Sequence, residues 1–515
     1  MILKTTLAVL VAAVAIVAAP VENEGAACPA PGPITLTSNA KLPDPFRKID
    51  GSRIATTGEW TCRREEIKEL SERYVYGDKP TRPQTVTGTV SASNITVNVS
   101  DQGRSASFSA RVELPSGTGP FPAVVVYGGF GADTAAIKAA GAAVISYDPY
   151  VVGREGTPRS NKQGAFYSVY GSSSSTGLLM AWSWGVSRII DVLEQSGGTV
   201  LRADATGVTG CSRFGKGAFV AGAFDQRVAL TMPIESGSAG VPIFRGIPGE
   251  GAQSLSSAYG EQPWLGDAFG SFTSDPSRLP VDTHEMVAMV APRGLFIMDN
   301  PHIANLGPRS ASVAALAGAE VYRALGATGN ITYWSDVQDG THCASRPEWR
   351  APLTANIQKF LRNTAATTGG MRISSKAQGR LADWVDWTTP VLGGGNPTTP
   401  PPSTPPPSTP PPSTPPPAGA GCSASVSLNS WSGGFVATVR VTAGATAVTG
   451  WNVGLTLPAG ATISNAWNVN RSATSGAVQF TNVAYNGALP PGGATEFGFQ
   501  ATGNSAAMTP LCTAT

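Results

Sequence analysis

Val-Thr-Gly-Cys-Ser-Arg-Phe-Gly-Lys, residues 208–216, sets a serine in a turn between two glycines. The turn follows an apolar run and precedes a helix-like stretch at residues 217–224, which is the strand–turn–helix context of a nucleophile elbow. The spacing departs from the usual G-x-S-x-G, because Phe214 stands where the second glycine belongs and Gly215 follows it. The context nevertheless predicts that Ser212 is a nucleophile for acyl transfer.

A basic side chain, Arg213, follows this serine directly. A guanidinium group next to the nucleophile can face the oxyanion that forms on attack, a task usually given to backbone N–H groups. We therefore expect Arg213 to stabilise that negative charge.

A serine nucleophile needs a base, and the chain has three histidines. His284 leads into an apolar helical run and is expected to be a structural hydrogen-bonding residue. His302 follows the strand-like run 295–298, where a site role and a loop role fit equally well. His342 lies in a glycine-marked loop before the last amphipathic helix, the usual place of the histidine in an α/β-hydrolase. His342 is therefore the predicted base.

The acid that orients this base should end a strand downstream of the serine. Glu235 follows the strand-like run 228–234, and Asp299 follows the run 295–298. The position of either carboxylate suits the acid. For each residue, the alternative interpretation is a helix cap or a loop carboxylate without a catalytic role. Glu235 is preferred on the family resemblance described below.

The N-terminus and the cysteines predict the compartment. Residues 1–19 read as a secretory signal peptide rather than a membrane anchor, because an apolar run begins near Lys4 and ends in alanines. The six cysteines are an even number, as expected of a secreted protein with paired thiols. Connectivity does not follow from the sequence alone, but position suggests the pairs Cys28–Cys62, Cys211–Cys343 and Cys422–Cys512.

Charge and composition exclude several partners. The 36 basic and 34 acidic side chains give a net charge of +2 without a basic run, so nucleic acid is not implied. The chain has no close group of histidine, cysteine and aspartate with metal-ligand spacing, so neither a metal nor another cofactor is expected. A monomer that does not bind membranes is the expected state.

Proline-rich repeats divide the chain. Residues 393–421 contain three copies of Ser-Thr-Pro-Pro-Pro, a tract that behaves as a stiff spacer. Residues 20–392 alternate strands with helices, which predicts an α/β fold of the α/β-hydrolase type, a three-layer sandwich. Residues 422–515 contain short alternating runs rich in Thr, Val and Gly, which predict a small all-β sandwich. The expected elements of the first domain include a hairpin at 95–99 and 108–112, strands at 123–127 and 142–147, and a helix at 178–193.

Residues from about 28 to 363 resemble the glucuronoyl esterases of carbohydrate esterase family 15, α/β-hydrolases that cleave the ester between glucuronate on xylan and lignin alcohols. The matching strings are 39–46, 97–103, 208–213, 215–219, 235–237 and 341–343. The resemblance implies Ser212 as nucleophile, His342 as base and Glu235 as acid, with Arg213 on the oxyanion. It also implies that the sugar hydroxyls are held by Lys216, Gln253 and Glu261.

Two positions depart from the family pattern. Many members carry a sugar-packing tryptophan where this chain has Asn305, so an apolar wall would have to come from elsewhere, with Trp264 as the candidate. Fungal members usually carry asparagine where this chain has Phe214. Both changes concern sugar binding and leave the hydrolytic residues intact.

The C-terminal segment, 422–512, resembles family 2 carbohydrate-binding modules. Flat exposed aromatic rings stack on sugar faces, and Trp431, Trp467 and Tyr485 match the binding-face positions. Trp451 is expected in the core, and the alternative is that all four rings are core. Cellulose is favoured over xylan as the ligand.

The favoured hypothesis is a secreted glucuronoyl esterase that acts on glucuronoxylan and lignin–carbohydrate esters and is anchored by a cellulose-binding module. One alternative is an acetyl xylan esterase, which Lys216 and Arg213 disfavour because an acetyl group offers no sugar ring to hold. Another is a catalytically silent wall-binding protein, which the complete set of catalytic residues disfavours.

Overall fold

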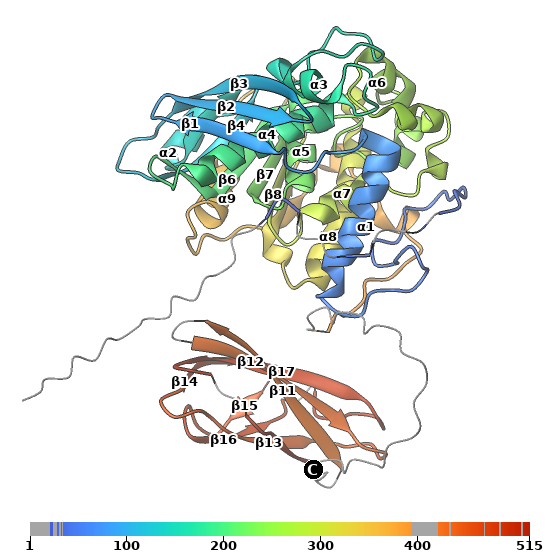
Figure 1. Ribbon diagram of the computed structural model, residues 1–515. Helices are drawn as coiled ribbons and strands as arrows, with labels where there is room; N and C mark the ends of the chain where they lie inside the picture. The colour runs from blue at the N-terminus through green and yellow to red at the C-terminus, as the bar shows by residue number, and fades with distance from the viewer. Residues whose placement is uncertain are drawn as a thin grey trace, which may run out of the picture. The chain divides into compact units, whose positions relative to one another are not determined.

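A ten-stranded mixed sheet forms the centre of the first part of the chain (Figure 1). The strands lie in the order β1-β2-β3-β5-β4-β6-β7-β8-β9-β10. β1, β2 and β3 are antiparallel to their neighbours, whereas every pair from β5 to β10 is parallel. The strands are β1 (Thr85–Val90), β2 (Asn94–Asp101), β3 (Arg104–Glu113), β4 (Phe121–Tyr127), β5 (Ala143–Tyr147), β6 (Leu201–Cys211), β7 (Val228–Ile234), β8 (Gly294–Met298), β9 (Ile331–Trp334) and β10 (Gly370–Arg372).

The structure is a computed structural model, and the residues that it describes form two compact units with separate cores. The described residues are 21–23, 28–29, 32, 34–393, 421–431, 434–467, 469–483, 486–505 and 508–514. The predicted signal peptide lies outside them, as does nearly all of the predicted spacer. The domain boundaries proposed from the sequence therefore remain predictions.

Helices cover both faces of the sheet, because successive side chains of a strand point to opposite sides. In β4, Ala123, Val125 and Tyr127 belong to one core, and Val124 and Val126 belong to the other. The first core is closed by α4 (Leu178–Gln195), α5 (Arg213–Phe224), α7 (Thr283–Val290) and α8 (Pro308–Ala324), and the second by α2 (Thr134–Ala139) and α9 (Pro347–Phe360). This arrangement confirms the predicted three-layer α/β-hydrolase fold.

The remaining helical segments surround this sandwich. They include α1 (Glu59–Ser71), the π-helix η1 (Glu72–Tyr76), the 3-10 turn η2 (Pro149–Val151), α3 (Ala165–Tyr170), α6 (Leu255–Glu261) and the 3-10 turn η6 (Ala304–Leu306). None of the helices in the described residues combines the length and the apolarity that crossing a bilayer requires.

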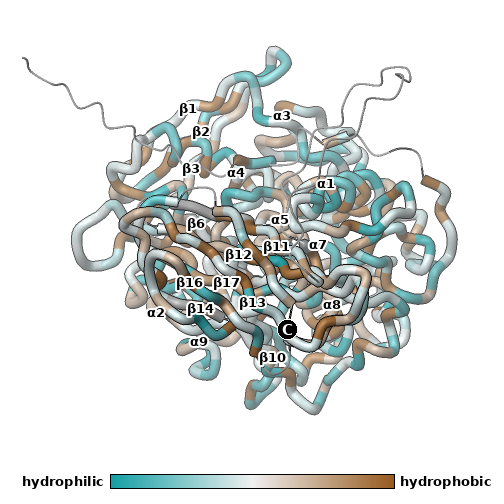
Figure 2. The backbone as a smooth tube through the Cα atoms, turned by 90° about the horizontal axis from the view of Figure 1, so that it is seen from below, coloured by the Kyte–Doolittle hydropathy of each residue, from teal (hydrophilic) through white to brown (hydrophobic). Residues whose placement is uncertain are grey.

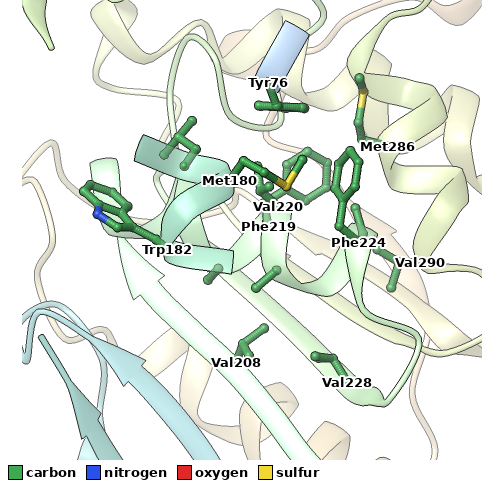
Figure 3. Close-up of a cluster of buried hydrophobic side chains, with 14 of the residues drawn as sticks. Tyr76, Met180, Trp182, Val208, Phe219, Val220, Phe224, Val228, Met286 and Val290 are labelled. Atoms are coloured by element: carbon green, nitrogen blue, oxygen red, sulfur yellow. The ribbon is translucent and has the colours of Figure 1, made fainter. Parts of the chain in front are cut away.

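Helix α5, which begins directly after Ser212, is anchored in the core. Figure 3 shows Phe219 and Phe224 of this helix beside Met180 of α4 and Met286 of α7. All of these side chains are buried, so α5 is packed between the sheet and its neighbouring helices. A helix buried in this way gives the serine a rigid platform.

Two antiparallel four-stranded sheets form the C-terminal unit, which confirms the predicted all-β fold. One sheet contains β11 (Cys422–Trp431), β12 (Gly434–Ala443), β17 (Ala494–Thr502) and β14 (Thr462–Trp467), and the other contains β15 (Asn470–Arg471), β16 (Ala477–Thr481), β13 (Trp451–Thr456) and β18 (Leu511–Ala514). Buried and exposed residues alternate strictly along β16, and the tube in Figure 2 shows apolar and polar residues interspersed along these strands.

The structure describes the side chain of only one of the four aromatic residues discussed for this unit, Trp451. Trp451 is buried and stacks on Phe497 with ring centroids 5.3 Å apart, which confirms its predicted core role. Trp431 and Trp467 end β11 and β14, but their side chains lie outside what the structure describes, and so does all of Tyr485. The predicted binding face therefore remains a prediction.

Candidate active site

Ser212 occupies a strained turn between β6 and α5. Its φ of 60° and ψ of −125° lie in a region that non-glycine residues rarely adopt, as expected of a nucleophile elbow. The serine N–H donates to the Ile234 carbonyl oxygen at 2.9 Å, which ties the turn to β7. A side chain at Gly215 would place Cβ 2.6 Å from that same carbonyl oxygen. The close approach to β7 therefore requires glycine at 215.

Glu235 and His342 form a hydrogen-bonded pair. The fully buried Glu235 Oε2 accepts a bond from His342 Nδ1 at 2.6 Å and another from the Cys343 N–H at 2.7 Å. Asn300 Nδ2 donates to the other carboxylate oxygen at 3.1 Å, so the carboxylate is held from both sides. Because His342 uses Nδ1 for this bond, its Nε2 remains for a reacting group, as in a serine hydrolase triad.

Ser212 and His342 line the same cleft, which has a volume of about 770 Å³. The cleft is lined by Gly128, Gly129, Phe130, Ser146, Tyr147, Asp148, Tyr150, Ser212, Arg213, Phe214 and His342. The geometry therefore brings together the predicted nucleophile and the predicted base.

Three disulfide bonds are present, with the pairings that position suggested. They are Cys28–Cys62, Cys211–Cys343 and Cys422–Cys512. The ligand atoms of Cys211, Cys343, Glu235 and His342 lie within 4.8 Å of one another. The two sulfurs of this group are bonded to each other and offer no thiolate, so the group is not a thiolate metal site.

Asp299, the other candidate acid, has other hydrogen-bond partners than His342. It accepts a hydrogen bond from the Tyr333 hydroxyl at 3.0 Å, and burial raises the pKa of its carboxyl to about 7. The next residue, Asn300, donates to Glu235. The structure thus places Glu235, and not Asp299, against the histidine.

The other two histidines have structural partners. His284 is buried, its Nε2 lies 2.9 Å from the Pro43 carbonyl oxygen, and burial lowers the pKa of the ring to about 4. His302 lies between the Val337 carbonyl oxygen and the Lys376 ammonium group, each at 2.9 Å. Neither ring lines the cleft.

Arg213 is held by an acidic residue that the sequence analysis missed. Its Nη1 lies 3.0 Å from Glu155 Oε2, and this carboxylate also accepts bonds from the Tyr150 hydroxyl at 2.8 Å and the Trp264 indole at 2.5 Å. The Glu155 side chain is only 9% exposed. Burial, together with the bond to Glu155, raises the pKa of Tyr150 to about 12. No motif surrounds Glu155, so only the folded contacts identify it.

The predicted sugar-holding residues gather beside this group. Lys216 is buried, its ammonium group donates to the Ser236 carbonyl oxygen and lies 5.4 Å from the Trp264 ring centroid, and Arg213 lies over the same ring at 5.7 Å. Burial lowers the pKa of Lys216 to about 7, although the nearby Glu261 carboxylate acts to raise it. Trp264 is 2% exposed, so its expected contact with a sugar remains a prediction.

Gln253 and Glu261 are paired with each other. Gln253 Nε2 donates to Glu261 Oε2 at 2.7 Å, and the Gln253 N–H donates to the Asn305 carbonyl oxygen at 3.0 Å. The second Glu261 oxygen lies 3.9 Å from the Arg213 guanidinium group. Asn305 is exposed in the turn η6, where no described contact of its side chain replaces the family tryptophan. Amide, carboxylate and ammonium groups are thus close together near the serine.

Two protein-family models match the chain. A model for fungal glucuronyl esterases matches residues 97–326, and a model for a cellulose binding domain matches residues 422–515. The 4-O-methyl-glucuronoyl methylesterase of Hypocrea jecorina is 41% identical over 375 residues, which cover 72% of this chain and 80% of that protein. The enzyme of the same name from Schizophyllum commune is 36% identical over 377 residues, which cover 71% and 94%.

Solved structures agree with these matches. The glucuronoyl esterase catalytic domain from Hypocrea jecorina has a TM-score of 0.66 and 39% identity, covering 71% of this chain and all of that one. A serine-to-alanine mutant of the Sporotrichum thermophile glucuronoyl esterase, in complex with methyl 4-O-methyl-β-D-glucopyranuronate, has a TM-score of 0.65, 33% identity and the same coverage. The chain therefore belongs to the glucuronoyl esterase family.

Proposed function

We propose that this protein is a secreted glucuronoyl esterase that hydrolyses esters of glucuronic acid on xylan with lignin alcohols. The observation that carries the proposal is the Glu235–His342 hydrogen bond, made beside the cleft that Ser212 and His342 share. A serine, a histidine and a buried carboxylate in this arrangement are the parts of a hydrolase triad. The relative crystallised with a methyl glucuronate ester supports the same class of substrate.

The proposed reaction uses a covalent intermediate. Ser212 Oγ attacks the ester carbonyl carbon while its proton passes to His342 Nε2, and Glu235 holds the ring by its Nδ1–H. The alcohol leaves with the proton that His342 carries, so the sugar acid stays attached to Ser212. Water then attacks this acyl group, gives a proton to His342 and releases the acid, and the serine recovers its proton.

Arg213 supplies the positive charge for the tetrahedral oxyanion in this proposal. Arg213 uses Nη1 for its bond to Glu155. The other N–H groups of the planar guanidinium can donate to the oxyanion. A donor that is already fixed in place costs no reorganisation when the charge develops. Glu155 is thus proposed as the residue that positions Arg213.

The sugar would be held on the side of Lys216. Its ammonium group and the Gln253–Glu261 pair are donors and acceptors suited to neighbouring hydroxyl groups. Trp264 would support the two cations from behind, and Asn305 leaves the other wall of this subsite open.

The C-terminal unit would anchor the enzyme to cellulose through Trp431, Trp467 and Tyr485. Three disulfide bonds and the apolar N-terminal run support an enzyme that acts outside the cell.

One assay tests the proposed activity. The purified protein should hydrolyse benzyl glucuronate faster than an aryl acetate, and Ser212→Ala should lower turnover by several orders of magnitude. Preference for the acetate would indicate an acetyl esterase instead, and activity retained by the serine variant would contradict the mechanism.

A further inference from the structure

A buried arginine contacts the loop that carries His342. Arg346 is the N-cap residue of α9, and its side chain is only 3% exposed. Its Nη2 donates to the Thr341 carbonyl oxygen at 2.6 Å, and its Nη1 lies 3.4 Å from the Asp339 carboxylate. The guanidinium group also lies over the buried Trp349 ring, 5.4 Å from the ring centroid. The arginine is therefore fixed in the fold and holds the two residues of the loop that it contacts.

This loop is the least regular part of the proposed triad. Residues 338–342 are exposed and belong to no helix or strand. An exposed irregular segment is more mobile than a sheet unless other groups hold it. The Cys211–Cys343 disulfide holds the chain directly after His342, and the bond from Arg346 to Thr341 holds the chain directly before it. The histidine is thus tied on both sides.

The same arginine approaches the proposed acid. Arg346 Nε lies 3.6 Å from Glu235 Oε1, the oxygen that accepts the bond from Asn300. Glu235 is fully buried, and a buried carboxylate is costly unless a cation or hydrogen bonds compensate its charge. Within the described part of the chain, no other arginine and no lysine comes within 4.0 Å of this carboxylate. Arg346 therefore connects the acid with the loop that carries the base.

We propose that Arg346 is a positioning residue of the triad, which fixes the loop before His342 relative to Glu235 and balances the charge of that carboxylate. The inference rests on the proposed serine mechanism and adds a residue that does not line the cleft, so that it acts through Glu235 and Thr341. A planar guanidinium has five N–H donors in a fixed fork and can hold several acceptors at once, whereas a lysine ammonium group is a single charge on a flexible stem. A shift of about 1 Å in a reacting group can cost roughly a hundredfold in rate.

Substitution of Arg346 tests this role by its separate effects on kcat and KM. With methyl glucuronate, Arg346→Met should lower kcat about ten- to a hundredfold and change KM less than about threefold, because the substrate contacts stay in place. Arg346→Lys keeps the charge without the fork and should recover part of kcat. The control is Arg350→Met, which removes another α9 arginine that is 60% exposed and pairs with Asp133 at 3.1 Å, and it should leave kcat unchanged. Natural kcat in Arg346→Met would overturn the proposal.

Coupling to Glu235 separates positioning from a general loss of structure. In a Glu235→Gln background, Arg346→Met should lower kcat by less than about threefold further, because residues that act as a unit are not additive. An equal loss in both backgrounds would mean that Arg346 only supports the fold, and would overturn the proposal. If Arg346→Met does not fold, Arg346→Lys takes its place in the comparison, and a kcat equal to that of the natural protein would then be the contradicting result.

A fluorophosphonate, which reacts with an activated serine, keeps this test independent of the sugar. Labelling of Ser212 should be about ten- to a hundredfold slower in Arg346→Met than in the natural protein, and an equal rate would overturn the positioning role. A natural protein that is labelled but hydrolyses no glucuronate ester would contradict the proposed function and leave the labelling comparison valid. A natural protein that is neither labelled nor active would contradict both.

Discussion

Cys211 and Cys343 are joined by a disulfide bond, so the residue before Ser212 is tied to the residue after His342. The backbone N–H of Cys343 also donates to the Glu235 oxygen that accepts the His342 bond. One covalent link and one carboxylate thus fix the relative positions of all three proposed triad members, which come from segments far apart in the chain.

Removing this bond should reduce activity before the sheet unfolds. The disulfide closes a sequence separation of 132 residues, and the double variant Cys211→Ala/Cys343→Ala should lose about 2–5 kcal/mol of unfolding free energy. Turnover should fall while the far-ultraviolet circular dichroism stays native. Cys28→Ala/Cys62→Ala, the matched control, should lower stability without a comparable effect on kcat. Mass spectrometry that finds a free thiol at Cys211 would contradict the argument.

Glu235 should matter more than Asp299 for turnover. Glu235→Gln removes the carboxylate that holds the His342 tautomer and should lower kcat by roughly 10²–10⁴-fold. Asp299→Asn should have a much smaller effect, because its carboxylate binds Tyr333 and not the histidine. The order of the two kcat values decides the assignment, and a larger loss in Asp299→Asn would assign the acid to the later strand.

Glu155 should act through Arg213. In Glu155→Gln the guanidinium group loses its negatively charged partner, and kcat should fall about tenfold or more with a smaller change in KM. Glu155→Asp keeps the charge and should recover part of the rate. The control is Glu113→Gln, which breaks a surface pair with Arg111 and should leave kcat unchanged. A Glu155→Gln variant with normal kcat would show that Arg213 needs no such support.

Lys216 should make stability depend on pH. Burial lowers the pKa of this lysine from 10.5 to about 7, so between about pH 7 and 10.5 the unfolded chain binds more protons than the folded one. Stability from this group therefore rises with pH in that window. The unfolding free energy of the natural protein minus that of Lys216→Met should increase by about 2 kcal/mol from pH 7 to pH 9.

Denaturant titration at the two pH values measures this difference. Lys41→Met, a control at a surface lysine that donates to the Asp383 carbonyl oxygen, should keep the pH slope of the natural protein. A Lys216 difference that is equal at pH 7 and pH 9 would mean that the buried ammonium group titrates normally.

Local signals in the sequence were sufficient to predict the early hairpin, helix α4 and the strand before Ser212. The predicted hairpin forms at Gln102 and Gly103, whose positive φ values of 50° and 74° suit a two-residue turn. The predicted helix at 178–193 corresponds to α4, and the strand before Ser212 corresponds to β6. In each case short-range residue preferences agree with the final fold, so the pattern is readable.

Features that depend on long-range contacts were not predicted. Helix α1 contains many charged residues, and one of them, Arg63, is buried in an ion pair with Glu285 at 3.0 Å. From the sequence alone, a charged side chain is expected to face solvent, because its distant partner is not known. Glu155 was missed for the same reason, because Tyr150, Arg213 and Trp264 reach it from different parts of the chain.

The C-terminal unit should bind cellulose without the esterase. Residues 422–515 contain their own core and the Cys422–Cys512 bond, so a fragment of this range should fold. It should sediment with microcrystalline cellulose, and Trp467→Ala should weaken the binding about tenfold or more, because stacked aromatic rings dominate such faces. Trp451→Phe, a change in the core, is the control for stability and should weaken binding much less.

The same unit should raise the rate of the esterase only where the substrate is part of an insoluble wall. A protein that ends near Thr388 should match the full chain on small soluble esters, because a proline-rich spacer transmits no conformational change. On insoluble cell-wall material the shorter protein should be slower, because binding to cellulose raises the local concentration of ester bonds around the enzyme. Adding the separate C-terminal fragment should not restore that rate, since only a covalent link holds the catalytic unit near the surface. Equal rates of the full and shortened proteins on insoluble wall material would show that the C-terminal unit has a task other than anchoring.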